Sequence, residues 1–411
     1  VMEQTYMTEI DIQKVRHLSD VHIPFFGDDS KPERKHLILT GKNGSGKTSV
    51  LHALMQQLEY IVSDDYAPLE ECEKMVAQLE VDINDINTHS VKRFAAEHKL
   101  PVWRDKLEKA RNGITADFTS IDALREKYAN GDFILAYFAD KRALNVTLPK
   151  SIENITTKPV YGIAESPNKD FERYLLSLKA RQSFAQTDNE MQKVSDIAAW
   201  FERFESILRR IYDDDSLKLR FNSDTFRFSI EMANREPFDF NTMSMGYAAI
   251  FDIIADILMR MEAKREYNLE GIVLIDEVEN HLHVELQKNI MPILTDLFPN
   301  VQFILTTHSP FILNSVPNSS VYDLEKHLLV ENGLTNLPYD GIIESYFDTD
   351  TFSSKLREKF ERYKELVSQP ECTDAEYAEM SELELYLDEV PDYLALDFAV
   401  EYNRLKLEAD K

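Results

Sequence analysis

Residues Gly41–Thr48, with the sequence GKNGSGKT, could bind the phosphates of a nucleotide. They match the pattern G-x-x-x-x-G-K-[ST] in full, between a short apolar run, LILT, and a segment expected to become helical near SVLHAL. The glycines allow backbone N–H groups to curl around a phosphate, and the helix N-terminus adds its positive end. Lys47 would reach the β- and γ-phosphates, and the Thr48 hydroxyl would bind Mg²⁺. The residues expected to bind the nucleotide in this loop are Gly41, Asn43, Gly44, Ser45, Gly46, Lys47, Thr48 and Ser49.

Two acidic residues, Asp276 and Glu277, follow the apolar run IVLI. A buried strand would place Asp276 at its carboxyl end, near the Mg²⁺ ion. Glu277 could then polarise an attacking water molecule as a general base. The alternative is that the pair only ends a strand at the surface.

A histidine, His308, ends a later apolar run, FILTTH. A lone histidine is often a structural residue. The carboxyl edge of a parallel sheet, however, is where such sheets bind ligands. We therefore expect a neutral imidazole that contacts the γ-phosphate or the attacking water.

The elements that position these residues can be read from the apolar pattern. The alternating runs EIDIQKV and DVHIPF predict half-buried antiparallel strands near the N-terminus. Further on, the runs GIVLIDE, VELQKNIMPILTDLF and VQFILTTHS predict a strand, a helix and a strand of a largely parallel sheet. The runs LKLRF and FRFSIEM around NSD predict a β-hairpin.

Two charged stretches carry an apolar residue every three or four positions, which predicts helices with one apolar face. The first stripe, Leu69 to Ile86, lies in a charged stretch from Pro68 to about Arg125; this stretch is too short for long coiled-coil arms, so we expect a helical hairpin inserted into the core. The second runs from Val194 to Ile211.

Composition limits the class of protein. The net charge of −27 disfavours non-specific coating of DNA. Cys72 and Cys372 cannot form a metal cluster alone and indicate no disulfide framework. No basic-then-apolar leader is visible, and Asp252 and Asp256 interrupt the longest apolar helix, Ala248–Met259. We expect a soluble cytoplasmic protein that does not use a membrane.

The segment MSMGY, Met243–Tyr247, follows the predicted hairpin and precedes an apolar helix. Its Ser-x-Gly triplet could be only a helix cap. Taken in order, however, these motifs resemble the ATP-binding-cassette (ABC) ATPases of the Rad50, RecF and chromosome-maintenance branch, whose signature Leu-Ser-Gly-Gly-Gln precedes the acidic strand. Ser244 and Gly246 match the two positions that touch phosphate, while Met245 and Tyr247 depart from Gly and Gln. The resemblance implies that Ser244 and the following helix N-terminus face the γ-phosphate held by another subunit.

The resemblance also implies the fold class: an α/β ABC-ATPase head with a RecA-like, mostly parallel sheet, an N-terminal antiparallel β-subdomain, a helical insertion and a C-terminal helical tail. The expected parts are an ATPase lobe with the phosphate loop (1–60), the helical insertion (61–130), a core strand and loop (131–165), a helical subdomain (166–215), the core with the signature, acidic pair and His308 (216–340), and an acidic helical region (341–411).

Other family features are weaker in this chain. The run VENHLH takes the place of the loop that crosses the dimer seam. His281 and His283 alternate in it like metal ligands, with Glu279 close by, but a zinc site needs three or four converging donors. No glutamine loop is visible, although Asp140 or Arg142 could replace it, and no adenine-stacking aromatic residue is identifiable.

The motifs look most like bacterial ATPases encoded in anti-phage modules such as OLD, Septu, PARIS and retron systems. The resemblance implies ATP and Mg²⁺ as cofactors and a homodimer or higher homo-oligomer with composite nucleotide sites. It further implies a separate effector, a nuclease or toxin, and a phage protein or nucleic acid as trigger.

OLD-type proteins also carry a nuclease with an Asp-x-Asp pair, which Asp348–Asp350 imitates. No strand-borne Glu-Gly precedes it, so we expect Asp350 to be a helix cap and the chain to contain no nuclease.

Two other functions stay open. A repair or chromosome-type ATPase would clamp DNA with clustered basic residues; the candidates are Lys179, Arg181, Arg209 and Arg210. A non-hydrolysing module would use ATP only to hold an assembly together. The acidic C-terminal region could mask a basic effector or form a solvated surface.

Overall fold

The computed structural model describes residues 4–25, 33–85, 89–141, 155–233, 235–316, 318–330, 354–367, 369 and 373–388. Its contacts divide the chain into two units, Val1–Asn336 and Leu337–Lys411. The finer division of the first unit at residues 60, 130, 165 and 215 stays a prediction.

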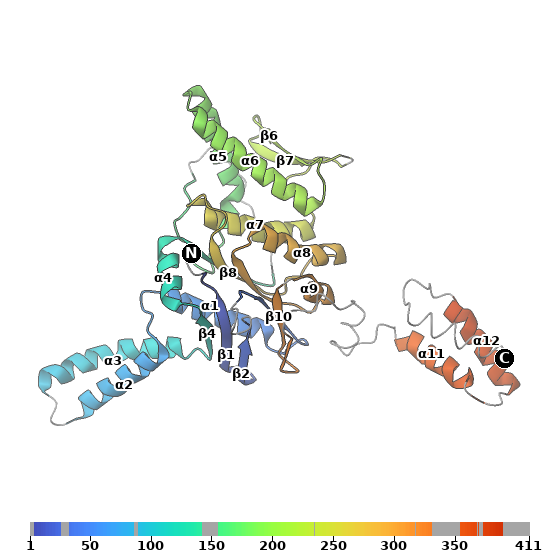
Figure 1. Cartoon of the computed structure of the whole chain (residues 1–411), viewed down its shortest axis with the longest axis horizontal. Coiled ribbons are helices and arrows are strands. Elements are labelled where there is room, and N and C mark those ends of the chain that lie inside the picture. Colours follow the sequence, from blue (N-terminus) through green and yellow to red (C-terminus); the bar gives the residue numbers. More distant parts are fainter. Residues whose placement is uncertain are drawn as a thin grey trace. The chain divides into compact units, whose positions relative to one another are not determined.

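A six-stranded sheet forms the centre of the first unit (Figure 1). Its strands, in spatial order, are β11 (Leu328–Val330), β10 (Ser319–Asp323), β3 (His36–Thr40), β9 (Val301–Thr306), β8 (Glu270–Ile275) and β5 (Phe133–Phe138). All neighbours are parallel except β10 and β11. Parallel neighbours end at the same edge, so the residues that follow β3, β8 and β9 meet there. The predicted α/β class with a largely parallel sheet is confirmed.

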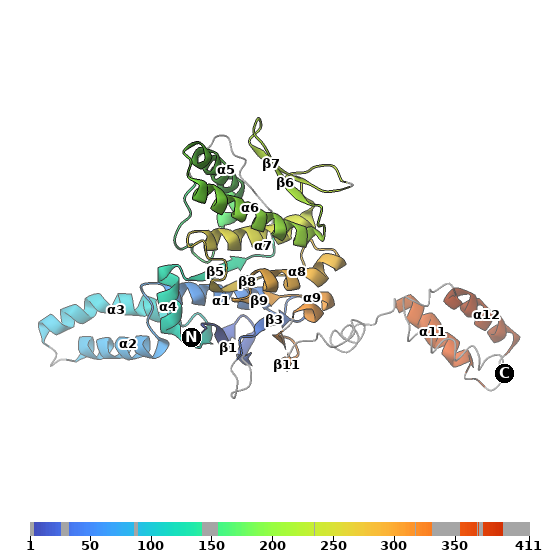
Figure 2. The same ribbon diagram turned by 45° about the horizontal axis from the view of Figure 1, so that its top comes forward.

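Helices cover both faces of this sheet, as buried parallel strands require. Helix α1 (Lys47–Val62) packs on one face, where Ile272 and Leu274 of β8 belong to its apolar cluster. The alternate residues Val273 and Ile275 are also fully buried and point to the opposite face. Figures 1 and 2 show α7 (Met245–Glu262) and α8 (Val284–Leu297) on that side.

A second, antiparallel sheet covers the outer side of α1. Its order is β2 (Leu18–Pro24), β1 (Met7–Val15) and β4 (Ile114–Phe118), and its apolar residues share the α1 cluster. The N-terminal antiparallel strands are therefore confirmed. The expectation that the chain stays helical from Pro68 to about Arg125 was wrong for residues 114–118. The ladder with β1, a partner distant in sequence, decides the conformation of ITADF.

The helical hairpin leaves and re-enters the first unit between α1 and β4. It consists of α2 (Leu69–Asn84) and α3 (Ser90–Ala110), and both views show it extending away from the sheets (Figures 1 and 2). Salt bridges join its helices; the pairs are Lys92–Asp82, Arg104–Glu80 and Arg111–Glu73. Helix α4 (Ile121–Asn130) follows β4.

A helical subdomain lies above α7 in Figure 2 and contains α5 (Phe171–Thr187), α6 (Met191–Tyr212) and the predicted hairpin β6 (Lys218–Asn222) and β7 (Arg227–Glu231). A short 3₁₀ helix, η1 (Pro167–Asp170), precedes α5. Four rings pack together at its base; they are Phe171, Phe204, Phe240 and Phe251. Phe240 lies four positions before Ser244, so this aromatic cluster anchors the segment that leads into α7.

In the described part of the second unit, two helices are present, α11 (Ser354–Val367) and α12 (Asp374–Asp388). They pack through a small apolar cluster that includes Tyr363 and Leu387, and the Arg362 guanidinium contacts both carboxylate oxygens of Glu379. Within the described residues, the C-terminal region is helical as expected. Asp348–Asp350, Cys372 and Arg142 lie outside the described residues. None of the helices in the described ranges combines the length and apolarity that crossing a membrane requires.

Candidate nucleotide site

The loop Gly41–Gly46 connects the end of β3 to the start of α1 at the carboxyl edge of the central sheet. Gly41 and Gly46 have φ angles of 134° and 98°, which other residues rarely adopt. A Cβ on Gly41 would also lie 2.8 Å from Ser45 Oγ, and one on Gly46 would lie 3.0 Å from Leu18 Cδ1. Both glycines are therefore required for the loop to curl beside the turn between β1 and β2.

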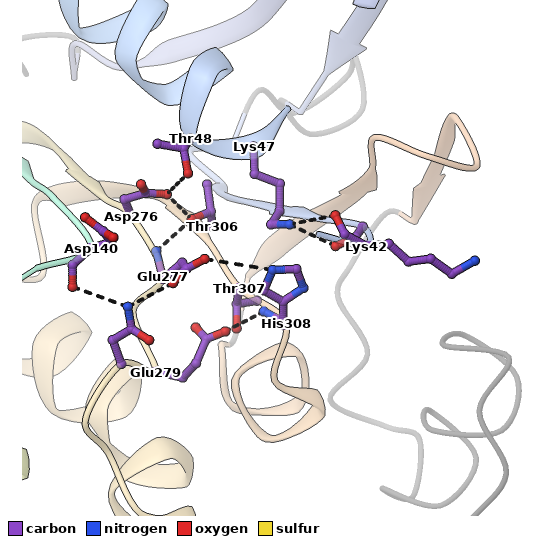
Figure 3. Close-up of polar contacts among 12 residues, drawn as sticks. Lys42, Lys47, Thr48, Asp140, Asp276, Glu277, Glu279, Thr306, Thr307 and His308 are labelled. Carbon is purple, nitrogen blue, oxygen red and sulfur yellow. Dashed lines mark hydrogen bonds and ion pairs between the residues drawn. The ribbon is translucent and has the colours of Figure 1, made fainter. Parts of the chain in front are cut away.

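Lys47 begins α1 and folds back over this loop. Its Nζ donates to the carbonyl oxygens of Gly41 at 2.9 Å and Lys42 at 3.1 Å (Figure 3). The residue is only 5% exposed. Burial lowers the pKa of the ammonium group, and the carboxylates of Glu277 and Glu279 oppose that shift.

Asp276 follows β8 and shares its carboxylate oxygen Oδ1 between two hydroxyl groups. Thr48 Oγ1 lies 3.3 Å from this oxygen, and Thr306 Oγ1 donates to it at 2.6 Å. Thr306, the last residue of β9, also accepts the backbone N–H of Glu277 at 2.7 Å. One hydroxyl thus positions both acidic residues. Thr306 was not predicted from the sequence, although a polar residue at the end of an apolar strand was a usable signal.

Glu277 and His308 lie next to each other at the same edge. Glu277 Oε1 is 4.0 Å from His308 Nε2, and Glu277 Oε2 accepts from Asn280 Nδ2 at 2.9 Å. Burial and the nearby Lys47 ammonium lower the pKa of His308, so the imidazole is neutral at pH 7. Glu279 accepts the backbone N–H of His308. From the sequence, Glu279 was considered only as a residue close to the two candidate metal-ligand histidines, and Asn280 was not identified, because each acts through a loop neighbour.

A pocket of about 420 Å³ opens beside the phosphate loop. Its walls come from the β1–β2 turn, the loop itself and the β10–β11 turn; they are His17, Leu18, Ser19, Lys42, Asn43, Ser45, Leu324, Glu325 and His327. Lys42 Nζ and Glu325 Oε1 form an ion pair of 3.0 Å between two of these walls. This pocket could not be predicted from the sequence, because it brings together three turns that lie far apart in the chain.

The signature segment has a mixed environment. Ser244 is exposed at the N-cap position of α7, but its side chain makes no capping hydrogen bond. Met245 is 67% exposed, whereas Met243 is buried. Gly246 is buried, and a Cβ there would lie 3.0 Å from Leu286 Cδ1 and 3.1 Å from the His281 carbonyl oxygen. The hydroxyl of Ser244 is thus presented at the surface rather than used in capping.

Two weaker candidates are Asp140, considered in place of a glutamine loop, and His283, considered as a metal ligand. The carbonyl oxygen of Asp140 is 3.3 Å from Asn280 Nδ2, at the margin of the site. His283 is the N-cap of α8 and accepts the Leu286 N–H at 3.4 Å, which is a structural role.

Three residues of the basic cluster have intramolecular contacts. Arg210 pairs with Asp296 and Arg209 with Glu205, while the Lys179 ammonium lies 5.3 Å from the centre of the Phe201 ring. The two ion pairs neutralise part of the positive charge that motivated a DNA-clamping function.

Comparison with known proteins adds the family. The family model AAA_21, described as "AAA domain, putative AbiEii toxin, Type IV TA system", matches residues 37–314. This range includes the phosphate loop, the signature segment, the acidic pair and His308.

Two relatives that align over most of this chain share about a quarter or less of their aligned residues with it. The Septu protein PtuA of Bacillus mycoides (strain KBAB4) is 24% identical over 397 residues, which cover 93% of this chain and 50% of that protein. The "Retron Vc95 probable ATPase" of Vibrio cholerae serotype O1 biovar El Tor is 22% identical over 355 residues, 70% of this chain and 68% of that protein. This chain therefore spans about half the length of the Septu relative. A solved SMC head domain from Thermotoga maritima is 14% identical and covers 77% of this chain and 94% of that one, with a TM-score of 0.35.

The family match covers more than half of the chain, and the relatives include a Septu protein and a retron probable ATPase, from two of the systems that the motifs resembled. The expected resemblance is confirmed: this chain belongs to the AAA-domain family that the AAA_21 model describes, with an α/β ATPase fold.

Proposed function

We propose that this chain binds and hydrolyses ATP with Mg²⁺, dimerises through composite nucleotide sites, and acts as a sensor or scaffold that controls a separate effector nuclease or toxin in anti-phage defence. The observation that supports it most is the convergence of the phosphate loop, Asp276, Glu277 and His308 at one sheet edge. The Septu and retron relatives support the defence context.

The residues present fit a triphosphate. The Lys47 ammonium already points into the loop, so it can exchange two carbonyl contacts for phosphate oxygens without a new side-chain arrangement. The Glu277 carboxylate can accept a proton from an attacking water, and the neutral His308 imidazole beside it can hydrogen-bond the water or the γ-phosphate. We place the adenine ring and the ribose of ATP in the 420 Å³ pocket beside the loop.

A Mg²⁺ ion also fits the donor set. The Thr48 hydroxyl and the Asp276 carboxylate are hard oxygen donors that lie 3.3 Å apart, the kind of ligands that Mg²⁺ prefers together with phosphate oxygens. These two residues would hold the ion, which neutralises charge on the phosphates when bound.

The exposed Ser244 supports a composite site. An N-cap hydroxyl that makes no capping bond, followed by the free N–H groups of the first turn of α7, offers donors to an anion outside its own protomer. In the dimer, this end of α7 would contact the γ-phosphate held by the other copy.

Hydrolysis is tested with Glu277→Gln, which keeps the size of the side chain but removes the base. We expect ATP affinity within about threefold of the parent and turnover lower by about 100-fold or more. Lys47→Ala should abolish binding. Turnover of Glu277→Gln at the parent rate would refute the assignment of the base. Retained nucleotide without phosphate release in the parent, with its native partner present, would favour the non-hydrolysing module instead.

Dimerisation is tested by sedimentation of Glu277→Gln with ATP and Mg²⁺. We expect an ATP-dependent dimer that Ser244→Tyr abolishes, because the ring would occupy the space of the γ-phosphate. Ser195→Tyr, at an exposed position on α6, serves as the matched control. If the Ser244→Tyr protein dimerises like its control, the proposed composite site is refuted. Co-purification from the native operon identifies the effector.

A further inference from the structure

Glu279 holds the backbone of His308 in place. Its Oε1 accepts the His308 N–H at 2.5 Å, and Figure 3 shows its side chain reaching from the turn after β8 to the end of β9. A carboxylate acceptor makes this a charge-assisted hydrogen bond, which is stronger than a bond between neutral groups. We propose that Glu279 is a positioning residue, which acts on the nucleotide through His308 rather than by contact. The inference rests on the proposed hydrolysis of ATP.

The imidazole needs such support because its own contacts are few. His308 Nε2 is buried and makes no hydrogen bond within the described ranges, and it lies 4.0 Å from Glu277 Oε1. The position of the ring therefore depends on the backbone of the segment between β9 and α9 (Pro310–Ser315). Glu279 holds this segment at His308 itself.

The two neighbours of His308 are held by other elements. The Thr307 N–H donates to the Leu39 carbonyl of β3 at 3.1 Å. Ser309 Oγ donates to Gln287 Oε1 of α8 at 2.6 Å. The residues on both sides of His308 are thus held by other elements. Within the described part of the chain, Glu279 is the acceptor found for the His308 N–H. Loss of this acceptor would leave a donor unpaired and allow the peptide to rotate.

Glu279 itself lies on a rigid turn. The Val278 N–H donates to the Thr306 carbonyl at 3.2 Å, and the Asn280 N–H donates to the Glu277 carbonyl at 3.0 Å. Val278 is fully buried. The carboxylate is therefore supplied by backbone that cannot move without breaking contacts with β9, which is what a positioning residue requires.

Side-chain length and charge can be tested separately. Glu279→Gln keeps an oxygen that can accept the N–H, Glu279→Asp keeps the charge but is one methylene shorter, and Glu279→Ala removes the acceptor. We expect kcat to fall about 10- to 100-fold in the Ala and Asp variants with KM within about twofold, because misplacement by about 1 Å can cost that much. Glu279→Gln should stay within about threefold of the parent. Glu285→Ala, an exposed glutamate on α8, is the control.

A double-mutant cycle with His308→Ala separates positioning from direct action. If Glu279 acts through His308, Glu279→Ala adds little to a chain that already lacks the imidazole. Additive effects in the cycle, or equal loss in the Gln and Ala variants, would overturn the inference. A parent without turnover would refute the proposed function but not this inference, which has a second readout.

That readout is the ring resonance of His308 in protein labelled with ¹³C-histidine, assigned by its disappearance in His308→Ala. The chain has 10 histidines, few enough to resolve. We expect the resonance to shift or broaden in Glu279→Ala and Glu279→Asp and to stay close to the parent position in Glu279→Gln and Glu285→Ala. An unchanged resonance in folded Glu279→Ala protein would refute the positioning role whether or not the chain hydrolyses ATP.

Discussion

Thr306→Val should separate the placement of the two acidic residues from the packing of the sheet. Thr306 is fully buried at the end of β9, and valine has nearly the same shape, so the change removes a hydroxyl and little volume. Two contacts are lost: the donation to Asp276 Oδ1 at 2.6 Å and the acceptance of the Glu277 N–H at 2.7 Å.

The expected decrease in the free energy of unfolding follows from these two contacts. A hydrogen bond to a charged group contributes about 1.5–3 kcal/mol, and a buried N–H left without a partner costs about 1–3 kcal/mol. The two are not independent, because one hydroxyl makes both. We therefore expect the free energy of unfolding to fall by about 3 kcal/mol. We also expect ATP turnover to fall at least about tenfold, because Asp276 and Glu277 both lose their support.

Urea unfolding followed by tryptophan fluorescence measures the change in the first unit alone, because both tryptophans, Trp103 and Trp200, belong to it. Thr40→Val is a matched control. Thr40 is likewise fully buried at the end of a central strand, β3, but its hydroxyl makes no hydrogen bond within the described ranges. This variant should be as stable as the parent or slightly more stable. If Thr306→Val and Thr40→Val have the same stability, the reasoning about the shared hydroxyl is wrong.

Two further predictions concern stability and assembly. Burial lowers the pKa of His36 to about 3, and its neutral ring accepts the Phe303 N–H at 3.0 Å. As the pH falls below about 6.5, only the unfolded chain takes up this proton, so the free energy of unfolding should fall by about 1.4 kcal/mol per pH unit more in the parent than in His36→Asn; equal slopes in urea titrations would contradict this. Gly246→Ala should change the free energy of unfolding by less than about 1 kcal/mol, since helix propensity offsets the close contacts with Leu286 Cδ1 and the His281 carbonyl oxygen. The substitution should nonetheless weaken the ATP-dependent dimer in sedimentation, because this end of α7 is proposed to contact the nucleotide of the other copy. A dimer as strong as that of the parent would argue against this contact.

The motifs were visible in the sequence because each is a local pattern. The spacing of the phosphate loop, the apolar run before Asp276 and the run before His308 are set by neighbouring residues, and their meeting at one edge follows from parallel strands. The residues that were overlooked depend on contacts across the fold. Thr306 joins β8 to β9, and Glu279 binds His308 through a backbone N–H that carries no sequence signal.

Strand β4 was not predicted for the same reason. The sequence around Ile114 lies between strongly helical stretches, and its alternation is too short to stand out. Its strand conformation comes from the ladder with β1, where Ile10 pairs with Ala116. Pairing over such a separation cannot be read from a local window, because β-propensity depends on the partner strand.

The turn that follows β8 also connects the nucleotide site to the surface proposed for dimerisation. Glu279 in this turn binds the His308 backbone, and the His281 carbonyl a few residues later lies 3.1 Å from where a Cβ on Gly246 would be. Gln287 bridges the same region, with its side chain bound to Ser309 and to the Leu282 carbonyl. A movement of His308 towards a bound γ-phosphate would therefore pull on the segment against which α7 begins. Since packed contacts of this kind do not deform continuously, nucleotide binding and presentation of Ser244 should change together rather than independently.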